Sequence, residues 1–270
     1  MYSFIESKDA KCQLNIDDIL EIENKFNIKF PNILKEYYIK YNGSQIKECY
    51  FSINGNDYNV NEIISLKYGK YSFEKEYEQV IENRYISNIY IPFAEDISNQ
   101  SYYFNFKDNK IYYISIDDII NPIFICDSID EFFEILNLCL DNSDIKYLDN
   151  YMISNDNPIK VVRYSDLVWV YSKKKMDNKY TIKGYLSNNK EEESCIVNTK
   201  EEMKEVFEKL SQKSPNLLCG YNKENIAKYN RINVAYKEQK KADLKGYFVF
   251  VLFIIIMILI LAIIYNVFYV

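Results

Sequence analysis

Two pairs of neighbouring carboxylates are the residues of this chain best suited to chemistry. Glu95-Asp96 ends one expected strand and Asp117-Asp118 ends the next hairpin. Paired carboxylates serve glycosidases, and carboxylate loops bind calcium. The sequence has no D-x-D-x-D-G loop, no G-x-S-x-G motif and no glycine-rich phosphate loop, with only 6 Gly in 270 residues. We therefore predict a protein that is not an enzyme, with no catalytic residue, no metal site and no cofactor.

Histidine is absent from the sequence. This absence excludes histidine acid–base catalysis, Ser–His and Cys–His dyads, and nearly all zinc sites. The cysteines contain no C-x-x-C pair and lie mostly in apolar surroundings, so we expect reduced, buried thiols. They are Cys12, Cys49, Cys126, Cys139, Cys195 and Cys219.

Charge is unevenly distributed along the chain. Residues 1–144 contain 25 Asp and Glu against 13 Lys and Arg, a net charge of −12, whereas residues 145–270 carry +6. An acidic region does not suit nucleic acid, which needs clustered cations, but it suits a basic protein partner. Glu95, Asp96, Asp117 and Asp118 are therefore candidate partner-binding residues. The alternative is that they only serve turns, as Asp127, Asp130 and Glu131 are expected to serve a helix start.

Helices and strands follow one another in an order typical of an α+β domain. Residues 15–27 predict a helix capped by Asn15, and Pro31 opens a second helix that stops at Asn42-Gly43. A strand over 48–54 leads to an Asn54-Gly55 turn, and a charged helix is expected over 73–85. Strands over 87–96, 101–106 and 110–118 predict a mostly antiparallel sheet with a turn at 107–110. A strand and a helix over 122–140, with an S-x-x-E capping box at Ser128, close the unit.

Residues 15–140 carry motifs of a known family. These motifs are I-x-x-x-E-x-x-x-x-x-x-F-P-x-x-L-K-x-x-Y ending at Tyr41-Asn42-Gly43, then IPFAED, the hairpin YYFNF/KIYYI and the helix SIDEFFEIL. In this order they resemble the SUKH superfamily, whose founding members include a fungal cell-wall-assembly regulator. The resemblance implies a binding domain without catalytic residues. In bacteria it implies an immunity protein that binds and blocks a toxin, nucleases included.

The rest of the chain is expected to add a linker and a second small domain. Residues 141–158 are rich in Asn, Asp and Ser and predict a linker after a domain at 1–140. Residues 159–222 predict a β-β-β-α unit of unknown role, with strands over 159–175 and 179–189 and a helix opening at Thr199. Trp169 is expected in its core, and Lys173-Lys174-Lys175 at a solvated turn.

The last 24 residues, from Tyr247 to Val270, contain no charged residue, no Pro and no Gly. As a helix they would extend roughly 36 Å, enough to cross a bilayer. Seven basic and three acidic residues lie between 223 and 245. This bias predicts a single-pass, tail-anchored protein of the plasma membrane with residues 1–246 in the cytoplasm, and the start of the chain lacks a signal peptide. The expected membrane-surface residues of segment 223–246 are Lys237, Lys240, Lys241 and Lys245.

These observations lead to two functional hypotheses. The first is a membrane-anchored immunity protein whose acidic face neutralises a basic bacterial toxin domain by stoichiometric binding. The second is a membrane-tethered scaffold or signalling adaptor that binds a cellular protein through the SUKH-like domain. The partner in both is a protein, together with the lipid bilayer, and not a nucleic acid.

Overall fold

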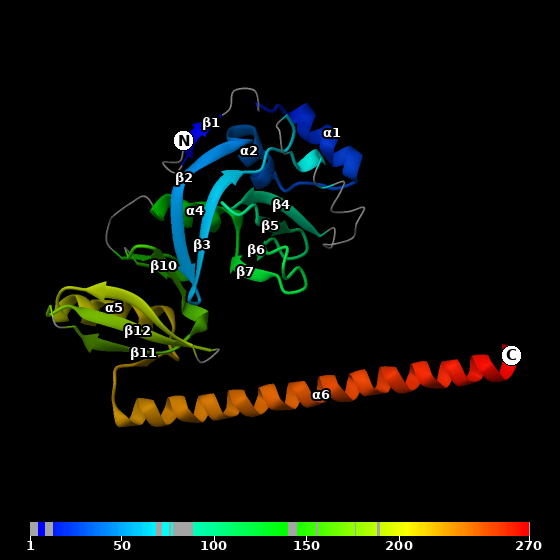
Figure 1. The fold of residues 1–270 in the computed structure, drawn as a ribbon. Coiled ribbons are helices and arrows are strands. Elements are labelled where there is room, and N and C mark those ends of the chain that lie inside the picture. The colour runs from blue at the N-terminus through cyan, green and yellow to red at the C-terminus, as the bar shows by residue number, and fades with distance from the viewer. Residues whose placement is uncertain are drawn as a thin grey trace.

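The computed structural model describes residues 5–8, 13–68, 72–75, 77, 89–139, 145–154, 156–175, 177–187 and 190–269. For a further set of residues the structure describes the backbone but not the side chain: residues 6–8, 239, 240, 242, 243, 246, 248, 249, 251, 256 and 259–269. Within the described part, the chain forms helices, a ten-stranded sheet and a four-stranded sheet (Figure 1). The mixed α+β class predicted from the sequence agrees with this architecture.

Two helices open the first unit as predicted. They are α1 (Ile16–Phe26) and α2 (Asn32–Tyr41). The Asn15 side chain accepts from the Asp17 and Asp18 amides, and the Asp18 carboxylate accepts from the Asn15 amide, which completes a capping box. Asn42 and Gly43 follow the end of α2, and Gly43 has a φ of 63°. Of the helix predicted over 73–85, residues 73–75 and 77 are helical, and the others lie outside the described residues.

The large sheet has the order β7-β6-β5-β4-β3-β2-β10-β9-β8, with β1 also paired to β2. Its neighbouring strands are antiparallel except β2 and β10, which are parallel. Its strands are β1 (Ile5–Lys8), β2 (Ser44–Ile53), β3 (Asn56–Ile63), β4 (Tyr90–Glu95), β5 (Ser101–Asn105), β6 (Ile111–Ile114), β7 (Ile123–Cys126), β8 (Lys146–Tyr147), β9 (Tyr151–Ile153) and β10 (Ile159–Arg163).

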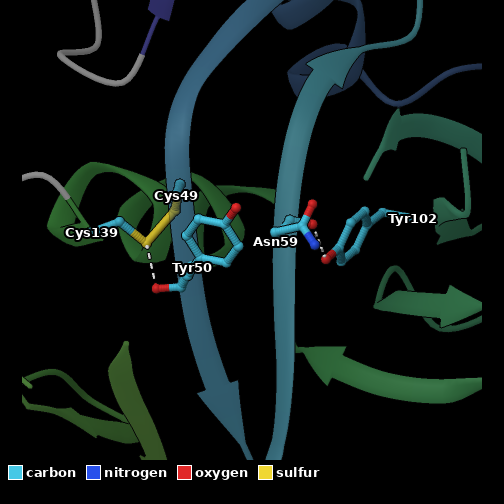
Figure 2. Close-up of a disulfide and its surroundings, with 5 residues drawn as sticks. All are labelled: Cys49, Tyr50, Asn59, Tyr102 and Cys139. Carbon is cyan, nitrogen blue, oxygen red and sulfur yellow. Dashed lines mark hydrogen bonds between the residues drawn. A yellow bond between two sulfur atoms is a disulfide. The ribbon is translucent and has the colours of Figure 1, made fainter. Parts of the chain in front are cut away.

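The predicted Asn-Gly turn joins β2 to β3. Asn54 and Gly55 have φ values of 54° and 73°, the left-handed conformation that tight hairpins need and that these two residue types tolerate. Across the strands, the Tyr102 hydroxyl on β5 donates to the Asn59 carbonyl on β3 at 2.7 Å (Figure 2). The hairpin tip points toward the second sheet (Figure 1).

The closing helix α4 (Ile129–Cys139) covers the sheet and completes the first core. The Phe133 ring on α4 stacks on the Tyr37 ring of α2, with centroids 3.8 Å apart. Cys139 at the end of α4 forms a disulfide with Cys49 on β2, with Cα atoms 5.5 Å apart (Figure 2). The expectation of reduced thiols is therefore wrong for this pair. Cys126, Cys195 and Cys219 are free, and Cys12 lies outside the described residues.

The segment predicted as a linker, residues 141–158, contains β8 and β9. Tyr151, Met152 and Ile153 of β9 are all buried, and β9 pairs with β10, which pairs with β2. A buried run of three residues is too short to outweigh the surrounding Asn, Asp and Ser as a sequence signal. In the structure this segment extends the first sheet.

The run predicted as one strand over 159–175 divides between the two sheets. After β10, a 3-10 turn (Tyr164–Asp166) leads into the second sheet, whose order is β13-β12-β11-β14. Helix α5 (Lys200–Lys213), capped by Thr199 as predicted, packs on its face. The strands are β11 (Leu167–Lys174), β12 (Tyr180–Leu186), β13 (Glu191–Val197) and β14 (Leu218–Cys219).

Helix α6 (Lys223–Tyr269) begins against the second sheet, and its C-terminal part extends as one long helix beyond both sheets (Figure 1). Tyr229 on α6 packs beside Trp169 and Tyr185, so Trp169 is buried as predicted. Within the described residues, no helix combines the length and the apolar character that a membrane crossing requires. The predicted span at 247–270 is thus not supported by the structure, and its side chains from 259 onward lie outside the described residues.

Candidate functional site

Two neighbouring loops at one border of the large sheet bring the predicted acidic residues together. One is the β4–β5 turn, residues 96–100, and the other is the β6–β7 loop, residues 115–122. The amide of Ile116 donates to Gln100 Oε1 at 2.7 Å and joins them. Strand register agrees, because Ser101 on β5 faces Ile114 on β6. We call residues 96–100 and 115–122, together with Ile123 at the start of β7, the isoleucine loops.

The isoleucine loops present large apolar side chains to solvent. Ile97 is 61% exposed, Ile116 77%, Ile120 85% and Ile123 42%. Single exposed apolar side chains are ordinary on protein surfaces, but several on adjoining loops are typical of an interaction site. Loops on a rigid sheet are also the usual place for binding residues.

Asp96 is not available to a partner. It is 5% exposed, and its Oδ1 accepts from the amides of Ser98 at 2.7 Å and Gln100 at 2.9 Å. Its Oδ2 accepts from the Tyr113 hydroxyl at 2.8 Å. Burial raises the pKa of Tyr113, and this hydrogen bond acts in the same direction, so the phenol stays protonated and donates. Asp96 therefore holds the turn in shape, as the alternative interpretation expected.

Glu95 is partly buried at the end of β4. It lies opposite Ser101 on β5 and opposite Glu62 on β3. Glu62 in turn accepts a hydrogen bond from the Gln45 side chain. Glu95 thus belongs to the polar edge of the strand more than to the exposed loop surface.

Asp117 and Asp118 are the acids that face solvent. Both are exposed in the β6–β7 loop. The Asp117 amide donates to Ser115 Oγ at 3.2 Å, and the Asp118 amide donates to the Ser115 carbonyl at 3.1 Å. Asp118 also accepts from the Asn121 side chain at 2.9 Å. The turn hydrogen bonds therefore fix the backbone and leave two carboxylates among exposed isoleucines.

The charge around these loops is uniformly negative in sequence. No Lys or Arg occurs in residues 85–106 or 111–145. The two basic residues of the β5–β6 turn, Lys107 and Lys110, lie at the opposite end of that hairpin, where Lys110 pairs with Asp127 at 2.6 Å. The isoleucine loops are therefore suited to a partner that is both apolar and basic.

The acids near the start of α4 serve the fold. Ser128 Oγ accepts from the Glu131 amide at 3.1 Å, and Glu131 Oε2 accepts from the Asp127 amide at 3.0 Å and from the Tyr151 hydroxyl at 2.7 Å. Asp130 is exposed in the first turn. No group of three or more His, Cys, Asp or Glu that could hold a metal ion occurs within the described residues.

The candidate membrane-surface residues lie on α6. Lys237, Lys241 and Lys245 are exposed, and the side chain of Lys240 lies outside the described residues.

The exposed isoleucines were missed in the sequence, although a signal was present. Within SIDDIINPI, several isoleucines alternate with Ser, Asp, Asn and Pro, which are turn residues. Apolar side chains inside a turn-rich segment have no strand face on which to be buried. Such a segment therefore indicates exposed apolar residues.

Comparison with known families matches two parts of the chain. Residues 13–135 match the SMI1 / KNR4 family (SUKH-1), in agreement with the resemblance found in the sequence. Residues 144–229 match a domain of unknown function, DUF6709. No curated protein matches the chain. The first match begins just before α1, ends within α4 and includes both isoleucine loops.

Proposed function

We propose, from the premise that residues 13–135 form a SUKH-1 domain, that this chain is an immunity-type binding protein. It neutralises a cognate bacterial toxin by stoichiometric binding and performs no catalysis. The resemblance to this family implies a protein-binding immunity module. The observation that carries the proposal is the pair of isoleucine loops, with four exposed isoleucines beside Asp117 and Asp118.

The apolar and the acidic side chains of these loops make different contributions to binding. Burying an isoleucine that is fully exposed contributes about 1.5–3 kcal/mol, so a few of them can supply most of a specific affinity. The carboxylates attract a basic surface, which raises the association rate and rejects acidic partners. Such a surface covers the toxin without altering it chemically.

The test uses the toxin domain encoded beside the gene, expressed in cells together with this chain. The doubly substituted variant Ile116→Ser/Ile120→Ser is expected to lose rescue and to bind at least about 100-fold more weakly. Asp117→Asn/Asp118→Asn is expected to slow association about tenfold at low salt and to act less at high salt.

Matched controls separate this surface from a general effect of substitution. Ile16 and Ile33 are 47% and 40% exposed on α1 and α2, and Asp57 is exposed on β3. Ile16→Ser/Ile33→Ser and Asp57→Asn should bind like the wild type. If these controls lose binding equally, or if no neighbouring toxin is bound or neutralised, the proposal is wrong.

The second part of the proposal places the protein at the plasma membrane. Residues 247–270 would form a single-pass anchor, and Lys237, Lys240, Lys241 and Lys245 would lie against anionic headgroups, with residues 1–246 in the cytoplasm. Support comes from the uncharged sequence and from the exposed apolar side chains of α6, among them Phe250 at 61% and Phe253 at 60%. Exposed apolar surface of this kind is rare in solvent.

Cell fractionation tests the anchor. The full chain should sediment with membranes and resist extraction with high salt, whereas a chain ending at residue 246 should be released by salt. A full chain that fractionates with the soluble proteins would rule out the anchor, while the toxin test above would stand unchanged.

The alternative is a scaffold or signalling adaptor that uses the same loops for a cellular partner. The observation that favours it is the region matched to DUF6709, residues 144–229, which extends beyond the first unit and which a toxin antagonist does not require. The neighbouring genes discriminate between the two, because a secreted multidomain toxin favours immunity and envelope or division genes favour the adaptor.

A further inference from the structure

One buried carboxyl group lies at the junction of the two sheets and has no hydrogen-bond partner. Glu192 on β13 is 8% exposed, and neither Oε1 nor Oε2 has a partner within the described residues. A buried polar group without a hydrogen bond is unfavourable, and a buried ionised one much more so. Glu192 is thus the one carboxylate among the buried acids of the described chain in which both oxygens lack partners.

The groups around Glu192 come from both units. The backbone amide of Gly55, at the β2–β3 hairpin tip, faces the carboxyl group without completing a hydrogen bond. Lys160 on β10, Lys190 before β13 and Asp166 in the 3-10 turn face it as charged groups, and the Asp166 charge opposes those of the two lysines. Burial nevertheless has the largest effect and raises the pKa of Glu192. None of these groups neutralises the carboxylate by a direct contact.

The junction lies between two hydrophobic cores. Ile53 and Val161, close to the hairpin tip, belong to the first core, whereas Cys195 and Val197 on β13 belong to the second. The β13 strand approaches β10 and the hairpin tip, so Glu192 lies where these cores adjoin. A charge placed there can loosen the contact without unfolding either core.

We propose that the contact between the β2–β3 hairpin tip and β13 is a joint controlled by the proton on Glu192. With the carboxyl group protonated, the joint is closed, as in this structure. When Glu192 ionises, its carboxylate moves to water and the tip separates from β13. The position of the second unit relative to the SUKH-1 domain then responds to pH.

The expected change of the opening equilibrium with pH follows from proton linkage. Glu192 holds its proton in the closed joint and releases it in the open joint. The equilibrium constant for opening therefore rises by up to about tenfold per pH unit, between the pKa of Glu192 in the open joint and its higher pKa in the closed joint. Below that range the joint stays closed, and above it the opening constant is constant at its highest value.

Hydrogen exchange of the full chain between pH 5 and pH 8, followed by mass spectrometry, tests the joint. The intrinsic exchange rate itself depends on pH, and this dependence cancels when each variant is compared with the wild type at the same pH. In the wild type, peptides covering residues 50–58 and 190–197 should lose protection toward pH 8 relative to Glu192→Gln, by up to about tenfold per pH unit. At pH 5 the two should exchange alike.

Glu193→Gln is the matched control, since Glu193 is the adjacent, partly exposed residue and pairs with Lys175 at 3.3 Å. It should follow the wild type at both pH values. Glu192→Met provides a second neutral side chain if the Gln variant folds poorly, and it should also keep protection at pH 8. Equal protection of the wild type and both neutral variants at pH 8 would overturn the proposal. So would a loss of protection that extends through both cores.

Discussion

Asp96 and Asp117 show how two acids of one surface take different roles. Asp96 accepts three hydrogen bonds and is buried, whereas Asp117 is exposed. Asp96→Ala leaves the amides of Ser98 and Gln100 and the Tyr113 hydroxyl without their acceptor, and it should lower the free energy of unfolding by about 2 kcal/mol. Denaturant titration measures this value.

Asp117→Ala provides the comparison, and it should change stability by less than about 0.5 kcal/mol. If Asp117→Ala lowered the free energy of unfolding more than Asp96→Ala, Asp96 would not be the residue that holds the turn. The sequence could not separate these residues, because an Asp among turn residues gives the same local signal whether its carboxylate bonds the backbone or faces water.

Asp18 on α1 gives the fold a pH-dependent contact. The Tyr68 hydroxyl donates to Asp18 Oδ1, and this hydrogen bond is the main cause that lowers the pKa of Asp18, followed by the Asn15 amide. A carboxyl whose pKa is lower in the folded state stabilises the fold fully above its unfolded pKa of about 3.9, and this contribution is lost as the pH falls through the folded pKa. Tyr68→Phe should therefore lower Tm at pH 7 and act less at pH 3.

Thermal unfolding of Tyr68→Phe at both pH values, in the wild-type and Asp18→Asn backgrounds, checks this. In the Asp18→Asn background the Tyr68 substitution should have an effect that does not change with pH. A Tm difference that grows toward pH 3 in the wild-type background would contradict the assignment.

At the scale of elements, the disulfide ties the end of α4 to the middle of β2. Cys49 and Cys139 are 90 residues apart, so the cross-link closes a long loop in the unfolded chain. Chain-entropy arguments give about 4.6 kcal/mol for a loop of this length. Cys139→Ser should lower the free energy of unfolding by that amount under oxidising conditions, and reductant should lower the wild type to the same value.

Cys219→Ser is the control for the disulfide, because Cys219 is a free thiol and its loss should not change the response to reductant. A wild type that is equally stable with and without reductant would mean that the two cysteines are not paired in solution. The sequence could not predict this pair, since nothing local links two apolar positions on a strand and a distant helix.

The single elements were predictable where a local rule determined them. Asn15 and Thr199 cap their helices and Asn54-Gly55 makes its turn, because these side chains bond to the nearby backbone or tolerate a positive φ. The division of 159–175 into β10 and β11 was not predictable. An apolar pattern indicates a strand but not the sheet that the strand joins, and the turn at Tyr164–Asp166 has neither Gly nor Pro.

At the scale of the whole molecule, the family resemblance of the first part of the chain and the α+β class followed from motifs in sequence order, and the family match at residues 13–135 agrees with the resemblance. The exposed isoleucines and the junction at Glu192 did not follow. Both depend on which surfaces the tertiary structure leaves uncovered, and such information is absent from any single segment. The C-terminal boundary of the first unit likewise depends on the tertiary structure and did not follow from the sequence.

The first unit should not fold stably when it is cut at residue 140, where the sequence placed its boundary. Its core takes four buried side chains from beyond that point: Tyr151, Ile153, Ile159 and Val161. In addition, β10 covers the edge of β2 from Phe51 to Ile53. Each lost side chain removes about 1.5–3 kcal/mol, and their sum is comparable with the typical 5–15 kcal/mol stability of a domain.

Denaturant unfolding of fragments 1–140 and 1–246, compared with the full chain, tests this boundary. Fragment 1–246 should unfold cooperatively near the midpoint of the full chain, whereas fragment 1–140 should be aggregated or unfolded without denaturant. Met152 and Val162 explain why the two units are coupled, because they lie on β9 and β10 of the first sheet but pack in the second core. If fragment 1–140 were as stable as fragment 1–246, then β8, β9 and β10 would contribute little to the stability of the first unit, and its boundary at residue 140 would stand.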